Sequence, residues 1–242
     1  MALHFLVENS SDAAVGDLVS LTGAEAKHAA VVRRLRVGEA ITVGDGAGVW
    51  LSGVAEEVSP SRVEVRVSVR SEEPAPHPRI VLAQALAKGD RDELAVQAAC
   101  ELGVDEIVPW QASRSVSRWE GPKAVKGRER WSTIVREAAK QAHRGWVPEV
   151  SPPATTADLA VRAASQRLLL LDPGASTRLS ELEPDGRDIV LVVGPEGGIS
   201  DEELTKLSDA GAERVLLGET VLRTSTAGPA AIAVLSVALG RW

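Results

Sequence analysis

Val190-Leu-Val-Val-Gly-Pro-Glu-Gly-Gly-Ile-Ser200 and Leu216-Leu-Gly-Glu-Thr-Val-Leu-Arg-Thr-Ser-Thr-Ala227 decide the fold of this 242-residue chain. Each stretch is a short apolar strand that runs into a glycine-bearing loop and then into a helix. Ligands of open α/β sheets bind in the crevice at the carboxyl ends of the parallel strands. The two loops therefore predict one crevice for a small molecule, and Arg223 predicts a positive charge at its mouth.

The chain around these loops alternates between apolar strand patterns and helix patterns. Strands are expected over residues 80–86, 105–110, 167–174, 189–193 and 215–217, and helices over 90–102, 126–143 and 227–239. Continuous apolar strands between helices indicate a parallel sheet that is covered on both faces. The last of these helices is apolar all round, so we expect it to be buried against the sheet or a partner chain.

The N-terminal part of the chain has a mostly β pattern. Residues 39–54 predict a hairpin, and the strict alternation of residues 62–70 predicts a strand with one buried face. Thr22 and Glu25 have the spacing of a capping box, which predicts a helix over residues 24–35.

A proline-rich segment separates the two patterns. It contains three prolines in five residues, which can continue neither a strand nor a helix. We therefore expect a small β domain over residues 1–72, a linker over 73–78 and an α/β domain over 79–242.

The composition is that of a soluble globular protein, with 44% hydrophobic and 25% charged residues. No apolar stretch is long enough for a membrane span, and the N-terminus lacks the pattern of a signal peptide. We therefore expect a cytoplasmic protein with no membrane partner. The single cysteine, Cys100, excludes an internal disulfide and lies in a helix pattern, where we expect a buried thiol.

A basic segment interrupts this acidic chain, whose net charge is −7. Residues 110–150 contain nine Lys or Arg against four Glu, together with four of the six tryptophans. Basic residues interleaved with aromatic ones can hold a phosphate backbone and stack on unpaired bases. A solvated helix face with core tryptophans explains the same pattern, and both interpretations stay open.

Gly194-Pro-Glu-Gly-Gly198 follows its strand directly, and Ser200 with Glu203 has the spacing of a capping box. Glycines let a ligand approach the backbone closely. The loop matches neither a nucleotide P-loop nor a dinucleotide fingerprint, so those two classes are unsupported. A plain tight turn is the alternative.

Two further groups of polar residues are candidates for function. Arg223 enters an apolar helix and needs an anion nearby, for which a salt bridge to a glutamate is the alternative. Glu137, Gln141 and Arg144 have spacings that place them on one helix face. Such a row is also common on faces that only meet solvent.

With these motifs in place, the chain resembles the bacterial 16S ribosomal RNA uracil-N3 methyltransferases, which belong to the SPOUT class of trefoil-knotted methyltransferases. The resemblance covers nearly the whole chain. It rests on residues 28–38, 101–104, 137–148, 194–198, 217–218 and 221–227. The last two motifs are specific when they follow the glycine loop in this order.

The resemblance implies a knotted, parallel-sheet SPOUT methyltransferase domain preceded by a small PUA-like β-barrel that helps to hold RNA. It implies S-adenosylmethionine as the methyl donor and a homodimer whose sites lie at the interface. The implied partner is 16S ribosomal RNA within an assembled or assembling small subunit. No metal ion is expected.

The resemblance also implies roles for particular residues. The expected donor-binding residues are Leu171, Gly194, Glu196, Gly197, Gly198, Leu217, Gly218, Leu222, Thr224 and Thr226. The expected RNA-binding residues are Arg33, Arg34, Arg36, Arg114, Arg118 and Gln141. For stabilising the uracil anion, Arg223 is the first candidate and Arg144 the second, and Glu137 is a candidate for the general base.

The chain departs from the family pattern at two places. Ser225 stands where the family usually has glutamate, so any role of that glutamate cannot be carried over. Gln141-Ala-His-Arg144 replaces a Gln-Ser-Gly-Arg seen in many members. Two alternatives stay open: a SPOUT enzyme with another RNA target, and a non-catalytic ribosome-assembly factor that kept the fold.

Overall fold

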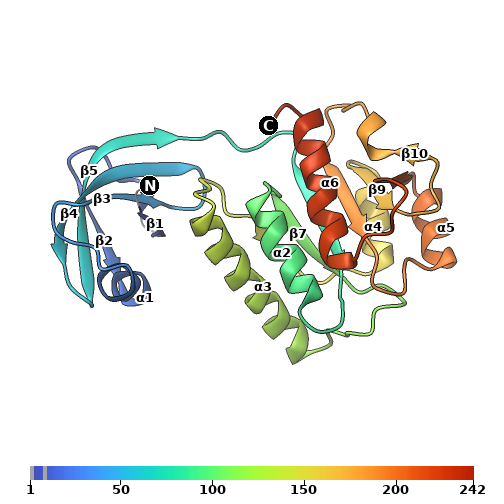
Figure 1. Ribbon diagram of the computed structural model, residues 1–242, viewed down its shortest axis with the longest axis horizontal. Coiled ribbons are helices and arrows are strands. Elements are labelled where there is room, and N and C mark those ends of the chain that lie inside the picture. Colours follow the sequence, from blue (N-terminus) through green and yellow to red (C-terminus); the bar gives the residue numbers. More distant parts are fainter. Residues whose placement is uncertain (1–2, 8–9) are drawn as a thin grey trace. The chain divides into compact units, whose positions relative to one another are not determined.

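Two units, each built on its own β-sheet, make up the chain in the computed structural model, which describes residues 3–7 and 10–242 (Figure 1). The first unit comprises Met1–Ala75 together with Ala139–Val147, and the second comprises Pro76–Ala138 together with Pro148–Trp242. The sequence gives no local sign that residues 139–147 join the first unit.

The first unit has a five-stranded sheet in the order β1-β3-β4-β5-β2. The strands are β1 (Leu3–Leu6), β2 (Leu18–Thr22), β3 (Ala40–Gly44), β4 (Val49–Val58) and β5 (Arg62–Glu72). Only the β1–β3 pair is parallel, and β3 and β4 form the predicted hairpin. The alternation predicted over residues 62–70 is only partly present in β5: Val63, Val65 and Val67 are buried, but Val69 is 56% exposed and Glu64 is buried.

The helix predicted over residues 24–35 is shorter and less regular than expected. It consists of α1 (Gly23–Lys27) followed by a π-helical turn, η2 (His28–Val32). The predicted capping box is wrong, because the Thr22 side chain makes no cap hydrogen bond. The Glu25 carboxylate instead accepts a hydrogen bond from the buried ammonium of Lys140 at 3.0 Å, and a buried ammonium needs such a partner.

The second unit has a seven-stranded sheet in the order β10-β12-β9-β11-β6-β7-β8, in which every pair is parallel. The strands are β6 (Ile80–Ala85), β7 (Glu106–Trp110), β8 (Glu149–Val150), β9 (Arg167–Leu171), β10 (Thr177–Arg178), β11 (Ile189–Val193) and β12 (Glu213–Leu216). The expected parallel α/β sheet is therefore confirmed, and β11 has the predicted bounds.

Helices cover both faces of this sheet. They are α2 (Arg91–Glu101), α3 (Pro122–Gln141), α4 (Thr156–Arg162), α5 (Asp201–Asp209) and α6 (Thr224–Ala238), with a short turn η3 (Leu179–Glu181). Helices α2 and α6 pack against each other and lie side by side in Figure 1, and both contact β6. On the opposite face, Leu159 of α4 and Leu207 of α5 share a buried cluster with Val190 of β11.

Helix α6 approaches the sheet closely because it carries a glycine at the contact. A Cβ atom on Gly228 would lie 3.0 Å from Cδ1 of Leu82 and 3.5 Å from Cγ2 of Val193. One face of α6 is buried as predicted, but Val237 on another face is 64% exposed. None of the described helices is long and apolar enough to cross a membrane.

Two of the helix ends lie where the sequence signals predict them, and one differs. Gly103 ends α2 with φ +97°, and Ser200 with Glu203 forms the predicted capping box at the start of α5. Helix α3 ends at Gln141, two residues before the predicted end. There His143 is left-handed (φ 55°), and the N–H of Arg144 bonds to the carbonyl of Ala139 at 3.0 Å, which closes the helix as a Schellman motif does.

Candidate active site

The two glycine loops line a single cavity of about 470 Å³ in the second unit, as their sequences predict. The cavity lies where β9, β11 and β12 end and where α6 begins. Most of the expected donor-binding residues line it, namely Leu171, Gly194, Glu196, Gly198, Leu217, Gly218, Leu222 and Thr224. Gly197 and Thr226 are exposed and do not line it.

The first glycine loop folds tightly upon itself. The N–H of Gly198 donates to the carbonyl of Pro195 at 2.8 Å, and Gly198 has φ +73°. A Cβ atom on Gly194 would lie 2.8 Å from Cγ1 of Ile199. Glycine is therefore needed at residue 194 for the closure of the loop itself, and not only for access of a ligand.

Thr224 fixes the start of α6 against this loop. Its buried hydroxyl donates to the carbonyl of Gly194 at 2.8 Å and accepts from the amide of Gln84 at 2.9 Å. Gln84 is fully buried at the end of β6. This chain of hydrogen bonds holds Arg223, which precedes Thr224, in a defined place relative to the glycine loop.

Arg223 is exposed, lines the cavity and is the N-cap residue of α6. Within residues 3–7 and 10–242 it forms no ion pair, so the alternative of a salt bridge to glutamate is not observed. The cavity therefore has a guanidinium group that can meet an anionic ligand.

The Glu203 carboxylate connects three segments near the first glycine loop through hydrogen bonds. This buried carboxylate accepts hydrogen bonds from the N–H and hydroxyl of Ser113, both at 2.8 Å, and from the hydroxyls of Thr156 at 2.9 Å and Ser200 at 3.0 Å. Burial by itself raises the pKa of Glu203, but these donors outweigh it and the pKa is lowered.

This arrangement predicts a loss of stability in acid. A carboxyl whose folded pKa is lowered contributes stability above its unfolded pKa, about 4.3 for glutamate, and loses it as the pH falls through the folded value. The free energy of unfolding of the wild type should therefore fall from about pH 5 downwards. Glu203→Gln should be less stable at pH 7 and should lose less on acidification. Urea unfolding at a series of pH values measures both, and parallel pH profiles of wild type and variant would contradict the assignment.

Arg91 also lines the cavity, although the sequence motifs do not mark it as a site residue. It follows β6, a neighbour of β11, and forms an ion pair with Glu196 at 2.9 Å. The signal that could have revealed it is its place at the start of the helix after a third apolar strand, because the carboxyl ends of adjacent parallel strands meet at one edge.

Part of the basic segment, residues 110–150, belongs to the core of the protein. Trp110 and Trp131 are fully buried, and Trp119 packs edge-on against Trp131 with ring centroids 5.0 Å apart. Trp110 and Trp131 are therefore core residues, whereas Trp119 and Trp146 are only partly buried. Arg114 remains exposed and donates to the carbonyls of Gly197 and Ile199, at 3.1 and 3.4 Å.

Arg118 also remains exposed, and its guanidinium donates to the carbonyl of Ser113 at 2.9 Å. Arg114 and Arg118 thus hold nearby backbone while their charges face solvent, which is compatible with the expected contact to RNA.

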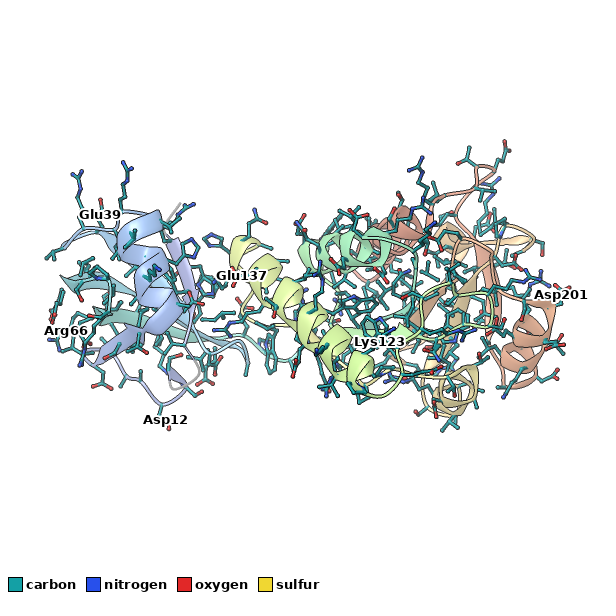
Figure 2. All side chains as sticks on the ribbon, turned by 90° about the horizontal axis from the view of Figure 1, so that it is seen from below. Asp12, Glu39, Arg66, Lys123, Glu137 and Asp201 are labelled. Atoms are coloured by element: carbon teal, nitrogen blue, oxygen red, sulfur yellow. The ribbon has the colours of Figure 1, made fainter. Side chains whose placement is uncertain are left out.

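The predicted polar row on α3 is only partly present. Glu137 and Gln141 are exposed near the end of the helix, and Figure 2 shows Lys123 and Glu137 towards opposite ends of α3. Placing Arg144 on the same face is wrong, because the helix ends at Gln141 and Arg144 lies beyond its cap. Neither Glu137 nor Arg144 is among the described residues that line the cavity.

Arg33, Arg34 and Arg36 lie together in the first unit, directly after η2, and all three are exposed. Arg34 is left-handed, with φ 56°. In the described part of the chain, no cluster of three or more His, Cys, Asp or Glu side chains could hold a metal ion.

Comparison with known families covers both units. A family model described as an RNA methyltransferase domain matches residues 73–236. A second model, described as an RNA methyltransferase PUA domain, matches residues 21–68.

Similar proteins align over nearly the whole chain. Ribosomal RNA small subunit methyltransferase E of Mycobacterium bovis is 40% identical and aligns over 100% of this chain and 94% of its own. The protein of the same name from Bacillus subtilis is 31% identical and aligns over 90% of this chain and 89% of its own. The crystal structure of this methyltransferase from Neisseria gonorrhoeae bound to S-adenosyl methionine has a TM-score of 0.88, with 30% identity and 98% of each chain covered. These matches confirm the predicted fold class.

Proposed function

The chain belongs to the family of ribosomal RNA small subunit methyltransferases E, and from that premise we propose that it methylates N3 of a uridine in 16S ribosomal RNA with S-adenosylmethionine as donor. One observation carries the proposal: the two glycine loops and Arg223 surround a single cavity in the methyltransferase unit. A cavity alone is compatible with many ligands, but the similar methyltransferase from Neisseria gonorrhoeae is bound to S-adenosyl methionine, which supports the same donor here.

The residues around the cavity fit the donor. Its volume of about 470 Å³ is in the range of small-molecule sites, roughly 300–1,000 Å³. Leu171, Leu217 and Leu222 offer apolar surface for an adenine ring, and the loops offer backbone groups that can read its edge. S-adenosylmethionine, when bound, supplies a methyl group activated by a sulfonium.

The protein must then make the uracil reactive. N3 of uracil carries a proton at neutral pH, and loss of this proton spreads negative charge over the two carbonyl oxygens. A guanidinium beside those oxygens stabilises that charge as an oxyanion hole does. Arg223 lines the cavity, which supports this role for it. Arg144 is the second candidate.

Removal of the N3 proton needs an acceptor, and Glu137 is the proposed general base. Its carboxylate is exposed near the end of α3. Because N3 lies on the Watson–Crick edge, the target uridine has to be unpaired or flipped out of a helix before these groups can reach it.

We propose that Arg33, Arg34 and Arg36 bind phosphates of the RNA, with Arg114, Arg118 and Gln141 as further contacts. Combining Arg33→Ala and Arg36→Ala with Arg34→Asn, which tolerates the left-handed backbone, should weaken RNA binding. The slope of log affinity against log salt should flatten by about one for each lost contact. Filter binding at several salt concentrations measures it, with Arg66→Ala as control because Glu56 already pairs with Arg66. An unchanged slope would show that the three arginines form only a solvated basic cluster.

A homodimer is part of the proposal. Val237, near the other end of α6, is exposed, and Val221 and Leu222, which line the cavity, leave apolar surface exposed beside the site. Such patches mark interfaces. Sedimentation at micromolar concentration should give twice the chain mass of 25.5 kDa, and a monomer would contradict the dimer.

Transfer of a tritiated methyl group tests the substrate class. The purified protein should label 16S ribosomal RNA in small subunits or their precursors, and should leave transfer RNA unlabelled. Labelling of transfer RNA would favour another RNA target, and binding without labelling would favour an assembly factor. Because the proposed substrate is ribosomal RNA, we place the reaction in the cytoplasm.

A further inference from the structure

Val116 is an exposed apolar residue in the loop that joins β7 to α3. It is 71% exposed, and two exposed arginines, Arg114 and Arg118, stand two positions before it and two positions after it. Single exposed apolar residues are common on protein surfaces and need no explanation by themselves. Val116 differs from them in its surroundings, because its loop is held by hydrogen bonds and lies next to the first glycine loop.

Hydrogen bonds fix the loop on both sides of Val116. On one side, the N–H and the hydroxyl of Ser113 both donate to the carboxylate of Glu203 at 2.8 Å. On the other side, the N–H of Trp119 donates to Oε1 of Gln111 at 2.9 Å. A loop that is held in this way keeps Val116 on the surface, where only a partner can cover it.

The loop contacts the first glycine loop through Arg114. Nη1 of Arg114 donates to the carbonyls of Gly197 and Ile199 at 3.1 and 3.4 Å. A Cβ atom on Gly197 would lie 3.3 Å from Cβ of Arg114. Gly198 and Ile199 line the cavity that is proposed for the methyl donor. Val116 therefore stands two positions from a side chain that contacts the wall of this cavity.

The two arginines keep a positive charge that the protein does not neutralise. Nη2 of Arg118 donates to the carbonyl of Ser113 at 2.9 Å, and neither Arg114 nor Arg118 forms an ion pair with a residue that the structure describes. Carbonyl oxygens accept hydrogen bonds but leave the charge of a guanidinium in place. An apolar side chain between two such cations complements a nucleic acid, because its phosphates bind cations and its bases offer apolar faces.

We propose that Val116 opens the RNA: it enters the base stack at the place that the target uridine leaves, while Arg114 and Arg118 bind phosphates on either side. The inference rests on the proposed function, because it assumes an RNA whose uracil N3 has to be exposed. Enzymes that act on a base take it out of the stack, and nucleic-acid-binding proteins insert apolar side chains to unstack bases. Contact of this loop with the glycine loop keeps the wedge near the donor that the uridine has to meet.

Methyl transfer to small ribosomal subunits is the first test. Val116→Ser removes the apolar wedge, and because the residue is exposed, the variant should keep the thermal midpoint and the donor affinity of the wild type. We expect its rate to fall about 10- to 100-fold, because no inserted apolar group then offsets the cost of unstacking. Val116→Leu keeps an apolar wedge and should retain most of the rate.

Val161→Ser is the matched control. Val161 lies on α4 in the same unit, is 74% exposed and is not among the described residues that line the cavity. Its replacement removes an equally exposed valine without touching the loop, so it should keep the full rate.

Fluorescence of 2-aminopurine reports the opening itself. This base analogue replaces the 3′ neighbour of the target uridine in an RNA hairpin, and its fluorescence rises when it loses its stacking partner. The wild type should raise the fluorescence when it binds. Val116→Ser keeps both arginines, so it should bind the hairpin with the same salt dependence as the wild type but raise the fluorescence far less.

Full activity of Val116→Ser on small subunits, or a wild type that binds the hairpin without raising its fluorescence, would overturn the inference and leave the proposed function standing. An equal loss of rate in Val116→Leu or in Val161→Ser would also overturn it, because the loss would not depend on an apolar group at this position. A wild type that labels no ribosomal RNA would overturn the proposed function and this inference with it.

Discussion

Arg223→Ala should lower turnover about a hundredfold or more and leave the affinity for S-adenosylmethionine nearly unchanged. The negative charge on the uracil appears only as its N3 proton departs, so Arg223 acts mainly on the transition state. Losing one such donor typically costs on the order of 3 kcal/mol. Because Arg223 is exposed and has no ion pair in the described part of the chain, its removal should not disturb the fold.

The measurement is single-turnover methyl transfer at saturating donor, combined with calorimetry for donor binding. Arg223→Lys should rescue only part of the rate, because one ammonium cannot reproduce the planar fork of the guanidinium. Arg187→Ala is the control for loss of an exposed arginine in the same unit and should keep the full rate. If Arg223→Ala lost donor binding and kept its single-turnover rate, Arg223 would be a donor-binding residue, and Arg144 would become the leading candidate for the uracil anion.

Gly218→Val should abolish donor binding in a chain that folds normally. Gly218 lines the cavity, its backbone is not left-handed, and a Cβ atom there would meet no atom within 4 Å. The added side chain therefore strains nothing in the protein but takes space that the ligand needs. We expect the affinity for S-adenosylmethionine to fall more than about a hundredfold.

Gly194→Val and Gly197→Val are less informative variants. A side chain at residue 194 would collide with Ile199, and one at residue 197 would lie 3.3 Å from Cβ of Arg114, so both disturb the loop itself. Calorimetry of Gly218→Val, with Gly218→Ala as the graded step, separates blocked binding from a broken loop. A thermal midpoint close to that of the wild type confirms folding, and full donor affinity in Gly218→Val would remove this loop from the site.

Local signals in the sequence predicted much of the methyltransferase unit. Apolar runs located β6, β7, β9 and β11, because strands buried on both faces carry a continuous signal. The two-residue strands β8 and β10 are too short to show any period, and α4 begins at a Thr155–Asp158 capping box that was not recognised. Residues 139–147 pack with the first unit through contacts distant in sequence, which no local pattern encodes.

Some residues of the candidate site could likewise be predicted from the sequence, and others could not. The glycine loops and Arg223 were predictable, since each follows a strand that the pattern identifies. Arg91 pairs with Glu196 105 positions further along the chain, and Gln84 pairs with Thr224 140 positions away. Such pairs form only when the sheet brings its carboxyl ends together, so they could not be derived before the strand order was known.

Nucleoside analysis of methylated 16S ribosomal RNA tests the central claim most directly. Small-subunit RNA treated with the wild-type protein and labelled S-adenosylmethionine is digested to nucleosides, and the label is assigned by chromatography and mass. We expect the label to appear in 3-methyluridine, and we expect Gly218→Val and Arg223→Ala to reduce it strongly. Label in any other nucleoside, or an RNA that takes up no label from an active, donor-binding protein, would contradict it.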